Sequence, residues 1–445
     1  MKNNIANNQK SLEQSVNQPA ERKSGDKELK GWRECKLGDV AMIKGGKRLP
    51  HGKDLSKIPN NHPYIRTKDI VNHKILINEL LFVPDDVFPS ISQYTVEKDD
   101  IIISIVGTIG SCAIIPKELH LANLTENCAK ITEISEDEAF PKFIFYYLIS
   151  PSGQEEILQR NVGSTQPKLP LYNLRDIHIL LPPLPEQKAI AAVLSSLDDK
   201  IDLLHRQNKT LEAMAETLFR QWFVEPCKNG LPEGWEMETF SKWILETYGG
   251  DWGKENAVGE YKKAVNCIRG TDIADLNIGI PTKTPIRYLK EEKYKSICPR
   301  EGDLIMEISG GTENQSTGRT CYINSQIEKL FDNPLSFSNF CRLIRLKKTD
   351  YTYFMYCYIQ YLYKQDEFFS FENGSSGIKN LNYKAILFEI FYPTPEEKII
   401  IEFQYFVKPI FDKIDQNKIQ IRTLEKLRDL LLPRLISGEI RVRYE

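Results

Sequence analysis

The 445-residue sequence lacks the usual marks of a membrane-spanning or secreted protein. No apolar run reaches the ~18 residues that a membrane-spanning helix needs, and the richest stretch, residues 101–115, is interrupted by Ser104, Gly107 and Gly110. The beginning of the chain shows no signal-peptide pattern. The nine cysteines include no pair at C-x2-C spacing, which disfavours a zinc site and a disulfide framework. We therefore expect a cytoplasmic protein with reduced thiols.

The sequence also lacks the motifs that catalysis, metal binding and nucleotide binding require. The Gly-rich segments VGTIGS and SGGTENQSTGRT have no G-x4-G-K-[ST], so turns between strands are favoured over an NTP-binding loop. All six histidines lie in the first half, and none belongs to an H-E-x-x-H motif. Residues 61–64, Asn-His-Pro-Tyr, lack the first proline of the Asn-Pro-Pro-Tyr box that grips a flipped adenine. We predict no catalytic residue, no metal site and no cofactor bound by this chain.

A strong charge imbalance is absent too. The net charge is −2, whereas a nucleic-acid-binding protein is often basic. Nucleic-acid binding depends on clustered rather than total charge, so local basic grooves remain compatible with this composition. Residues 1–28, by contrast, are rich in Asn, Gln, Ser and Lys, and this composition predicts a disordered N-terminal arm.

What the sequence does contain is one domain-sized pattern written twice. Gly31-Trp32 recurs as Gly234-Trp235, and Ile65-Arg66 recurs as Ile268-Arg269. Each copy begins with strand-like runs and Gly-rich turns and ends with a long helical pattern. We predict an α+β fold with two similar globular domains, separated by two long antiparallel coiled-coil helices in a pseudo-two-fold repeat. The predicted boundaries are residues 29–183 for the first globule, 184–228 for the first helix, 229–394 for the second globule, and 395–445 for the second helix and C-terminal tail.

Apolar residues at alternating spacings of four and three, the heptad signature, mark a first helix at about residues 186–223. At ~1.5 Å per residue this helix is about 57 Å long. The second helix carries the same pattern, and each seam contains one asparagine, Asn208 or Asn417. A buried Asn is costly unless it is paired, so we predict that the two face each other and set an antiparallel register. The alternative is that both lie near solvent and the register is set elsewhere.

The predicted register brings particular apolar residues of the two helices together: Leu194 with Leu431, Ile201 with Leu424, Leu204 with Ile421, and Leu211 with Ile414. Two prolines interrupt the second helix. Because a proline inside a helix removes a hydrogen bond and kinks the backbone, we predict a bend near Lys408 and fraying near Pro433. Apolar residues off the seam are either extra core or a docking face for another subunit; they include Val193, Leu203, Met214, Phe219, Leu427 and Leu430.

Three segments carry a resemblance to a known family. They are the opening GWRECKLGDVAMIKGG, the segment DDIIISIVGTIGSCAII, and the run GSTQPKLPLYNLRDIHILLPPLPEQKAIAAVLSSLDDKIDLLHRQNKTLEAMAETLFRQWF at residues 163–223. They resemble the specificity subunits of type I restriction–modification systems. The resemblance covers nearly everything after residue 28, and the closing LEKLRDLLLPRLISGEI is again similar to the family. In the second copy, YPTPEEKII stands where LPPLPEQKAI stood in the first.

The resemblance implies that each globule is a target recognition domain that reads one half of a split site in double-stranded DNA. It also implies partners: two modification subunits that bind S-adenosylmethionine and methylate adenine, and restriction subunits that join for cleavage. Two similar units suit half-sites about one DNA turn, ~34 Å, apart. GGKRLPHGKDL has no counterpart in GGDWGKENAVG, so the target should be asymmetric. The alternatives are a coiled-coil scaffold that reads no sequence, or the recognition subunit of a fused methyltransferase–nuclease system.

Candidate DNA-contacting residues are those of the types that bind phosphates or base edges, at loop positions. They are Lys44, Lys47, Arg48, His51, Lys53, Arg66, Lys68, Gln166 and Lys168 in the first copy, and Lys254, Lys262, Lys263, Arg269, Asn314, Gln315, Arg319 and Lys379 in the second. Each could equally be an ordinary solvated surface residue. Because Arg66 and Arg269 recur in both copies, a structural role, pairing with Asp69 and Asp272, is a rival interpretation for these two.

Overall fold

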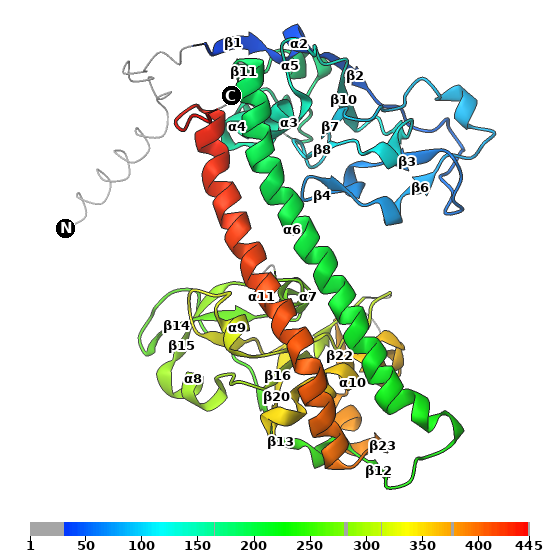
Figure 1. Ribbon diagram of the computed structural model, residues 1–445, viewed down its shortest axis with the longest axis vertical. Helices are drawn as coiled ribbons and strands as arrows, with labels where there is room; N and C mark the ends of the chain where they lie inside the picture. The colour runs from blue at the N-terminus through cyan, green and yellow to red at the C-terminus, as the bar shows by residue number, and fades with distance from the viewer. Residues whose placement is uncertain (1–30, 164, 280–283, 313, 375–377, 444–445) are drawn as a thin grey trace. The chain divides into compact units, whose positions relative to one another are not determined.

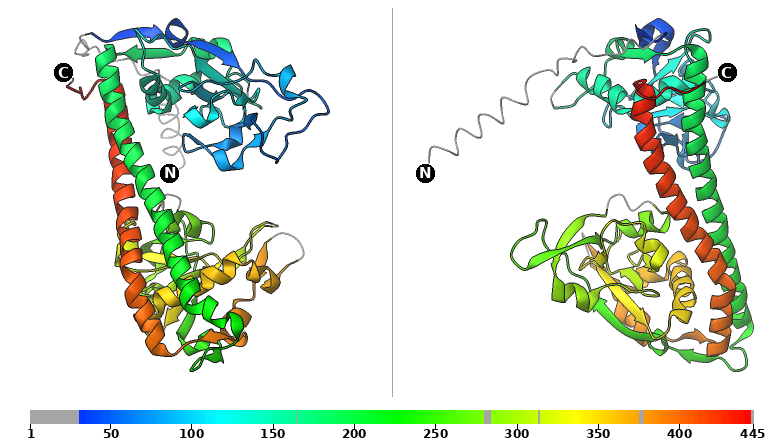
Figure 2. Two further views of the ribbon diagram at one scale, coloured as in Figure 1. Left: turned by 45° about the vertical axis from the view of Figure 1, so that its right-hand side comes forward. Right: turned by 60° about the vertical axis from the view of Figure 1, so that its left-hand side comes forward.

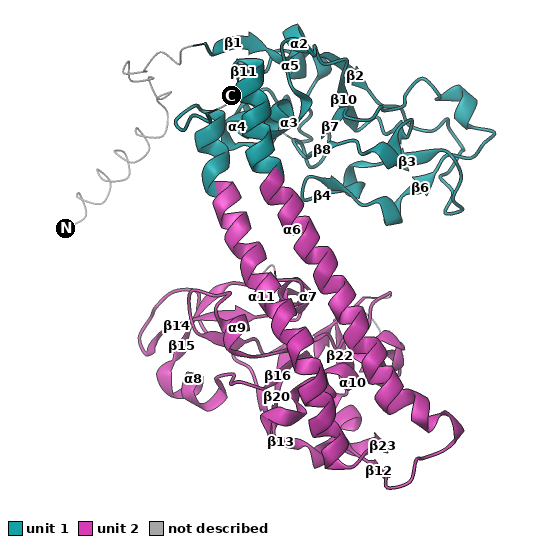
Figure 3. Ribbon diagram, in the orientation of Figure 1, with its two compact units in different colours: residues 1–195, 430–445 teal, residues 196–429 magenta. Residues whose placement is uncertain are grey.

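The computed structural model describes residues 31–163, 165–279, 284–312, 314–374 and 378–443 (Figure 1). The predicted N-terminal arm, residues 1–28, therefore lies outside the described residues. The chain divides into two compact units, a first unit of residues 1–195 and 430–445 and a second unit of residues 196–429 (Figure 3). Each unit takes a share of both long helices. Within the described ranges, every helix is too short or too polar to cross a membrane.

The first unit is built around a four-stranded antiparallel sheet. Its strands, in spatial order, are β2 (Met42–Gly45), β10 (Cys128–Thr132), β7 (Ile101–Ser104) and β8 (Cys112–Ile114). Both faces of β7 are buried, which explains its uninterrupted apolar run. Side chains alternate across a strand, so Ile101 and Ile103 enter one apolar cluster with Phe143 while Ile102 enters another with Ile65.

Smaller sheets and short helices complete the first unit. The sheets are β6 (Leu81–Phe82), β3 (Pro63–Ile65) and β9 (Asn123–Leu124), with β3 and β9 parallel; β1 (Arg33–Lys36) with β11 (His178–Leu181); and β4 (Ile70–Val71) with β5 (Lys74–Ile75). The helices are α2 (Leu37–Val40), α3 (Pro141–Ile149), α4 (Pro151–Gln159) and α5 (Leu171–Arg175).

The second unit repeats this topology. Its main antiparallel sheet runs β13 (Ile244–Gly249), β20 (Cys341–Leu346), β16 (Leu304–Glu307) and β18 (Thr320–Tyr322). Beside it lie β15 (Ile286–Lys290), β14 (Tyr261–Ile268) and β19 (Leu335–Phe337), again with one parallel pair, and β12 (Glu236–Glu238) with β23 (Tyr392–Thr394). It adds a sheet of β17 (Ser309–Gly310), β22 (Lys379–Leu381) and β21 (Glu372–Asn373), and the helices α7 (Asp272–Asn277), α8 (Glu291–Ile297), α9 (Ser325–Glu328) and α10 (Thr352–Lys364).

The predicted duplication is therefore visible in strand order, and it extends to individual backbone positions. The Ile65 carbonyl accepts from the Thr125 amide in the first unit, and the Ile268 carbonyl accepts from the Ser338 amide in the second. A buried aspartate, Asp100 or Asp303, directly precedes the central strand β7 or β16. The residue before it has a positive φ in both copies: 69° for Asp99 and 87° for Gly302. The same turn is therefore built from different residues.

Two long helices pair in antiparallel fashion, as predicted. Helix α6 spans Leu184–Phe219 and continues into a π-helical turn, Arg220–Val224; helix α11 spans Glu397–Ile436 (Figures 1 and 2). In the second unit the four predicted partners Ile201, Leu204, Ile421 and Leu424 form one apolar cluster. In the first unit Leu431 packs against the cluster that contains Leu194. As residue numbers rise along α6, the numbers of the contacting residues on α11 fall, so the two helices are antiparallel.

Asn208 and Asn417 meet in this seam. The Asn417 side-chain amide donates to Asn208 Oδ1 over 2.8 Å, and the Asn208 amide donates to the Ile414 carbonyl over 3.3 Å. The two side chains are 4% and 0% exposed, so the solvent-facing alternative is wrong. Asn417 Oδ1 has no partner among the described residues, so the pair is not the most stable filling of the seam. That cost fits a role in selecting the register, which stays a prediction.

The expected fraying near Pro433 is wrong, because α11 continues through both Pro409 and Pro433 to Ile436. Each proline removes one backbone hydrogen bond, but buried neighbours keep the helix in place. Phe411 lies in the core of the second unit just after the first proline, and Leu435 and Ile436 lie in the core of the first unit just after the second. The bend near Lys408 stays a prediction.

The C-terminal tail packs back on the start of α6 within the first unit. Arg441 donates to both carboxylate oxygens of Glu186, with N–O distances of 2.5 and 2.7 Å, and the Trp32 indole donates to the same carboxylate over 3.1 Å. The Glu186 side chain is fully buried. Ile440 and Val442 pack against the apolar core on the same segment. Residues near both ends of the described chain therefore meet at one carboxylate.

We expect the Asn pair to be energetically coupled. Asn208→Ala and Asn417→Ala should each lower the free energy of unfolding by about 1–3 kcal/mol, because each leaves a buried amide without its partner. The double variant should cost less than the sum, with a coupling energy of about 0.5–3 kcal/mol. Urea denaturation of the four proteins measures this coupling, with the exposed Lys209→Ala on the same helix as a control. Strictly additive losses would contradict the pairing.

Arg441→Ala should destabilise the first unit selectively by about 1–3 kcal/mol, because the buried Glu186 carboxylate loses its counter-ion. Hydrogen exchange followed by mass spectrometry should then show faster exchange in β1, β11 and the first turns of α6, with the second unit unchanged. Arg434→Ala is the matched control, since it removes a neighbouring arginine whose ion pair with Glu439 is exposed. Equal effects of the two changes would rule out a special role for the buried pair.

Candidate nucleic-acid interface

In the first unit several loops converge beyond one end of the main sheet. We call this surface the first loop edge. It comprises residues 46–48, 65–69, 105–110, 124–128 and 166–169. Backbone hydrogen bonds join these loops to one another: Lys47 N to Leu124 O (2.8 Å), Thr125 N to Ile65 O (3.0 Å), Ile105 N to Asn127 O (2.8 Å) and Leu169 N to Ile105 O (2.9 Å). Segments far apart in sequence are thus held as one surface.

The second unit has a matching second loop edge, made of residues 250–253, 268–272, 308–312, 314–319, 337–341 and 379–381. The equivalent hydrogen bonds are Asp251 N to Phe337 O (2.9 Å), Ser338 N to Ile268 O (2.9 Å), Ile308 N to Phe340 O (2.8 Å) and Leu381 N to Ile308 O (2.9 Å). The backbone scaffold under the two edges is the same, while the side chains on it differ.

Each loop edge begins with a glycine, Gly46 or Gly250, where two backbone segments come closest to each other. A Cβ on Gly46 would lie 2.1 Å from the Thr125 carbonyl oxygen, and one on Gly250 would lie 2.2 Å from the Ser338 carbonyl oxygen. No side chain fits at either position. The chain can therefore turn directly out of β2 or β13 into the loop that follows, which carries Lys47 and Arg48 in the first unit.

Arg66 and Arg269 lie on the loop edges, but both are held by aspartates. Arg66 donates to the two carboxylate oxygens of Asp69 over 2.8 and 2.7 Å, and Arg269 donates to those of Asp272 over 2.9 and 2.7 Å. The hydrogen bonds that Arg269 donates to Asp272 raise the pKa of Arg269. The structural contact that rivals DNA binding is therefore present in both copies, and it braces the turn that follows β3 or β14.

Two further candidates on the second loop edge are also paired. Arg319 makes a two-pronged hydrogen bond to Glu307, with N–O distances of 2.9 and 2.6 Å. Lys379 donates to Glu372 over 2.8 Å. Burial raises the pKa of Glu372, but the hydrogen bonds from Lys379 and from the Thr317 amide outweigh it and leave that pKa below its usual value. These cations shape the loop, and Asn314 and Gln315 are exposed at its turn.

The other candidates of the first copy are exposed. Arg48 reaches Glu126 over 3.0 Å while 76% of its side chain is accessible, and Lys47 lies 5.8 Å from the centroid of the Tyr94 ring. Exposed pairs of this kind contribute little stability, so a phosphate can compete for these cations. The remaining exposed candidates on or beside the edge are His51, Lys68, Gln166 and Lys168, together with Lys44 and Lys53, which pair with Glu133 and Asp86.

Two candidates of the second copy lie away from its loop edge. Lys262 and Lys263 lie near the start of β14, whereas Arg269 follows the end of that eight-residue strand. At ~3.3 Å per residue the separation is roughly 20 Å. Lys254 and Lys263 lie over the rings of Tyr261 and Tyr294, at 5.7 and 5.0 Å from the centroids. The structure does not bring Lys262 and Lys263 to the edge that carries Arg269, Asn314 and Gln315, whereas Lys254 directly follows edge residues 250–253.

The structure also shows residues on or in contact with the second loop edge that the sequence did not single out. Glu307 and Glu372 are acidic residues that anchor basic partners, and Ser309 Oγ donates to Asn380 Oδ1 between β17 and β22. Their partners lie up to 71 positions away in the chain, so no short motif links them. Within the described ranges, no group of His, Cys, Asp or Glu is arranged to hold a metal ion.

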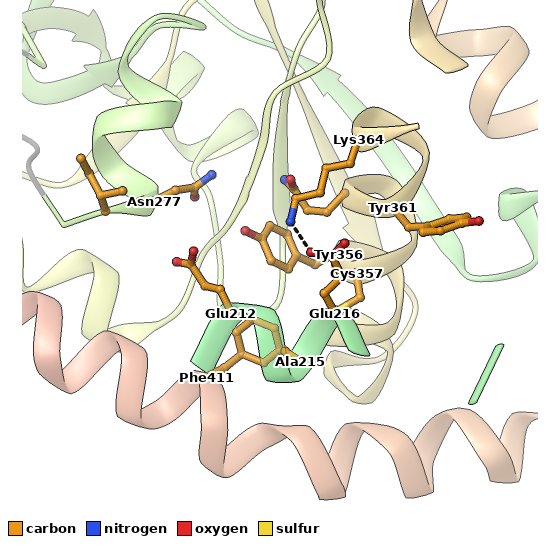
Figure 4. Close-up of a pocket in the computed structure, with 11 residues that line it drawn as sticks. Glu212, Ala215, Glu216, Asn277, Tyr356, Cys357, Tyr361, Lys364 and Phe411 are labelled. Carbon is orange, nitrogen blue, oxygen red and sulfur yellow. Dashed lines mark hydrogen bonds and ion pairs between the residues drawn. The ribbon is translucent and has the colours of Figure 1, made fainter. Parts of the chain in front are cut away.

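A cavity of about 140 Å³ opens elsewhere in the second unit, among α6, α7, α10 and α11 (Figure 4). Lys364 and Glu216 form an ion pair at its wall over 2.5 Å. Burial raises the pKa of Glu212, and Lys418 and Lys364 only partly oppose this. The rings of Tyr356 and Phe411 line the same space. None of the candidate DNA-contacting residues lines this cavity.

Comparison with known proteins agrees with the resemblance found in the sequence. The family model of the type I restriction modification DNA specificity domain matches residues 29–213. The chain is 26% identical over 441 residues to the type I restriction enzyme MjaIX specificity subunit of Methanocaldococcus jannaschii, covering 93% of this chain and 94% of that protein. It is 24% identical over 484 residues to the HindI specificity subunit of Haemophilus influenzae, covering 93% of this chain and 100% of that protein. The resemblance to specificity subunits is thereby confirmed.

A solved structure shares the fold. The S subunit of a type I restriction–modification system from M. genitalium superposes with a TM-score of 0.54 at 17% identity, covering 93% of this chain and 97% of that chain. At this identity the likeness speaks for the fold alone, which combines α+β units with a long helical pair.

Charge reversal on the first loop edge should weaken DNA binding. The double variant Lys47→Glu/Arg48→Glu should lower affinity for duplex DNA by at least about tenfold at all salt concentrations, and reduce the slope of log K against log salt by roughly 2 if both side chains meet phosphates. Fluorescence anisotropy over a salt series measures both quantities.

The matched control is Lys98→Glu/Lys117→Glu. This variant has the same change in charge, and its exposed lysines lie at the other end of β7 and β8 from the loop edge. It should bind DNA nearly as the wild type does. Unchanged affinity of the Lys47/Arg48 variant, or an equal loss in the control, would remove this loop from the footprint.

Proposed function

We propose that this chain is the DNA-reading subunit of a type I restriction–modification complex. Its residues 29–213 match the family of the type I restriction modification DNA specificity domain. It binds an asymmetric, bipartite site in double-stranded DNA, with one loop edge on each half. The observation that carries this proposal is the pair of loop edges, which have the same backbone hydrogen bonds and different side chains.

The duplication has a direct consequence for recognition. A shared scaffold presents loops to DNA in an equivalent way in both copies, while base preference depends on the side chains that reach the groove. Those side chains differ between the edges: Lys47 and Arg48 follow the glycine turn in the first unit, and Asp251 and Trp252 follow it in the second. Two different half-sites follow from this difference.

The same proposal assigns the chemistry to partner subunits. Two methyltransferase subunits would bind S-adenosylmethionine and methylate adenine, and restriction subunits would cleave, while this chain supplies no catalytic residue and holds no cofactor. The long helices offer docking surface. Phe219 is buried as extra core, but Leu203, Met214, Leu427 and Leu430 are exposed on α6 and α11. Exposed apolar side chains on a helix are available to a partner subunit.

Two other functions make different demands. A scaffold that reads no sequence needs the helical seam but has no use for two different sets of side chains on one conserved loop framework. The recognition subunit of a fused methyltransferase–nuclease would share the loop edges and differ in its partner. The first of these is separated from the proposal by DNA selectivity, and the second by the identity of the protein that co-purifies.

The test is selection from a random-sequence duplex pool, followed by gel shift with the full chain alone and with its methyltransferase partner. We expect one split motif whose halves differ, bound at least about 10³-fold more tightly than random DNA at physiological salt, with the partner raising affinity. Binding that is equal on all sequences would leave only the scaffold. A palindromic motif would contradict the assignment of one half to each loop edge.

A further inference from the structure

We propose that residues 314–319, between β17 and β18, are a base-reading segment of the second unit, with Glu307 and Glu372 as its positioning residues. Asn314 and Gln315 are its reading residues. This inference rests on the proposed function, and it names the specificity-determining residues of one half-site.

Glu307 fixes the C-terminal end of this loop, at Arg319. Its side chain is 1% exposed at the end of β16, and Arg319 meets both of its carboxylate oxygens. Glycines leave room for the buried carboxylate: a Cβ on Gly270 or Gly310 would lie 2.5 or 2.4 Å from Glu307 Oε1. The backbone adds a bond from the Glu307 amide to the Arg319 carbonyl over 2.8 Å. A buried, two-pronged ion pair of this kind resists movement of either partner.

Glu372 anchors the middle of the loop from the neighbouring strand β21. One carboxylate oxygen accepts from the Thr317 amide over 2.6 Å, and the other accepts from Lys379 over 2.8 Å. The Tyr363 hydroxyl donates to the Ser316 carbonyl over 3.3 Å. Next to these, Gly318 lies against the Phe368 ring, where a Cβ would be only 2.3 Å from a ring carbon. Residues 316–318 are therefore fixed by side chains from three other segments.

The anchored part carries a tight, exposed turn. The Thr312 amide donates to the Gln315 carbonyl over 2.8 Å, and the Asn314 amide donates to Thr312 Oγ1 over 3.3 Å. Asn314 and Gln315 are exposed. Their side-chain amides carry a donor and an acceptor side by side, the arrangement that pairs with adenine N7 and N6 in the major groove. A turn held in advance loses less conformational entropy on binding than a free loop does.

The first unit fixes its shorter equivalent loop by other means. Ser104 stands at the end of β7 where Glu307 stands at the end of β16; its Oγ accepts from the Ser111 amide over 2.9 Å and donates to the Thr108 carbonyl. Gln154 reaches the loop from α4 and donates to the Gly110 carbonyl over 3.0 Å. The two halves of the site therefore depend on unrelated anchors. A change at Glu307 should disturb only one of them.

The experiment uses the full chain with its methyltransferase partner and selection from a random duplex pool. The wild type defines a split motif. In Glu307→Gln the Arg319 guanidinium loses its counter-ion and the loop loosens, so one half of the motif should lose its base preference while the other keeps it. Affinity for the wild-type motif should fall at least tenfold. Asn314→Ala/Gln315→Ala removes only exposed side chains and should erase preference in the same half.

Ser104→Ala is the matched control, and it should affect the other half or neither. Glu307→Asp should restore part of the lost preference, since it keeps the charge. Thermal melting of every variant checks folding. If the wild type selects no motif, the proposed function fails and this inference fails with it. If the wild type selects a split motif but the Asn314/Gln315 variant selects the same one, or Glu307→Gln weakens both halves equally, only this inference is overturned.

Discussion

Each compact unit completes its apolar core with residues from both long helices. The core of the first unit contains Leu194 from α6 together with Leu435 and Ile436 from α11, and the core of the second contains Phe219 from α6 and Phe403 from α11. Each unit therefore requires both long helices to be present and in register. The antiparallel seam, with its buried Asn208–Asn417 hydrogen bond, is the condition on which both cores depend.

This dependence accounts for features that look unrelated along the chain. Helix α11 tolerates two prolines because it is held by apolar contacts on both sides of them, and these outweigh the loss of single backbone hydrogen bonds. The tail after α11 closes on Glu186 through Arg441, because the last turns of α11 already lie in the core of the first unit. The ends of the described chain are thereby tied to the helix that ends the first copy of the repeat.

Buried carboxylates organise the loops in both units, and they divide into shared and unshared sets. Asp69 and Asp272 brace the same turn, each by a two-pronged arginine pair. Asp100 and Asp303 make the same bond to the backbone amide three residues earlier, over 2.8 Å in each copy. At the position equivalent to Glu307, the first copy has Ser104 and no carboxylate. The carboxylates that both copies share brace the common fold. Glu307, which the first copy lacks, lies beside a longer loop. Two diverged copies are expected to differ in recognition at such a loop.

The sequence was most informative where the physical cause is local or periodic. Heptad spacing and one asparagine in each seam predicted the pairing of Ile201 with Leu424 and of Asn208 with Asn417, because a buried amide needs a partner and a helix repeats every 3.6 residues. The Arg66–Asp69 pair was predictable because its members are three positions apart in the chain. Fraying at Pro433 was a wrong prediction, because a local rule was applied where distant packing decides.

What the sequence by itself determined is therefore the duplication, the α+β class, the helical seam and its register. Only the tertiary structure decided which candidate cations lie on a loop edge and which are already paired. Lys262 and Arg269 are close in sequence but a strand's length apart, while Glu307 and Arg319 are separated by a loop and yet in contact. Electrostatic partners are chosen by proximity in space, and the burial that strengthens a pair exists only once the chain has folded.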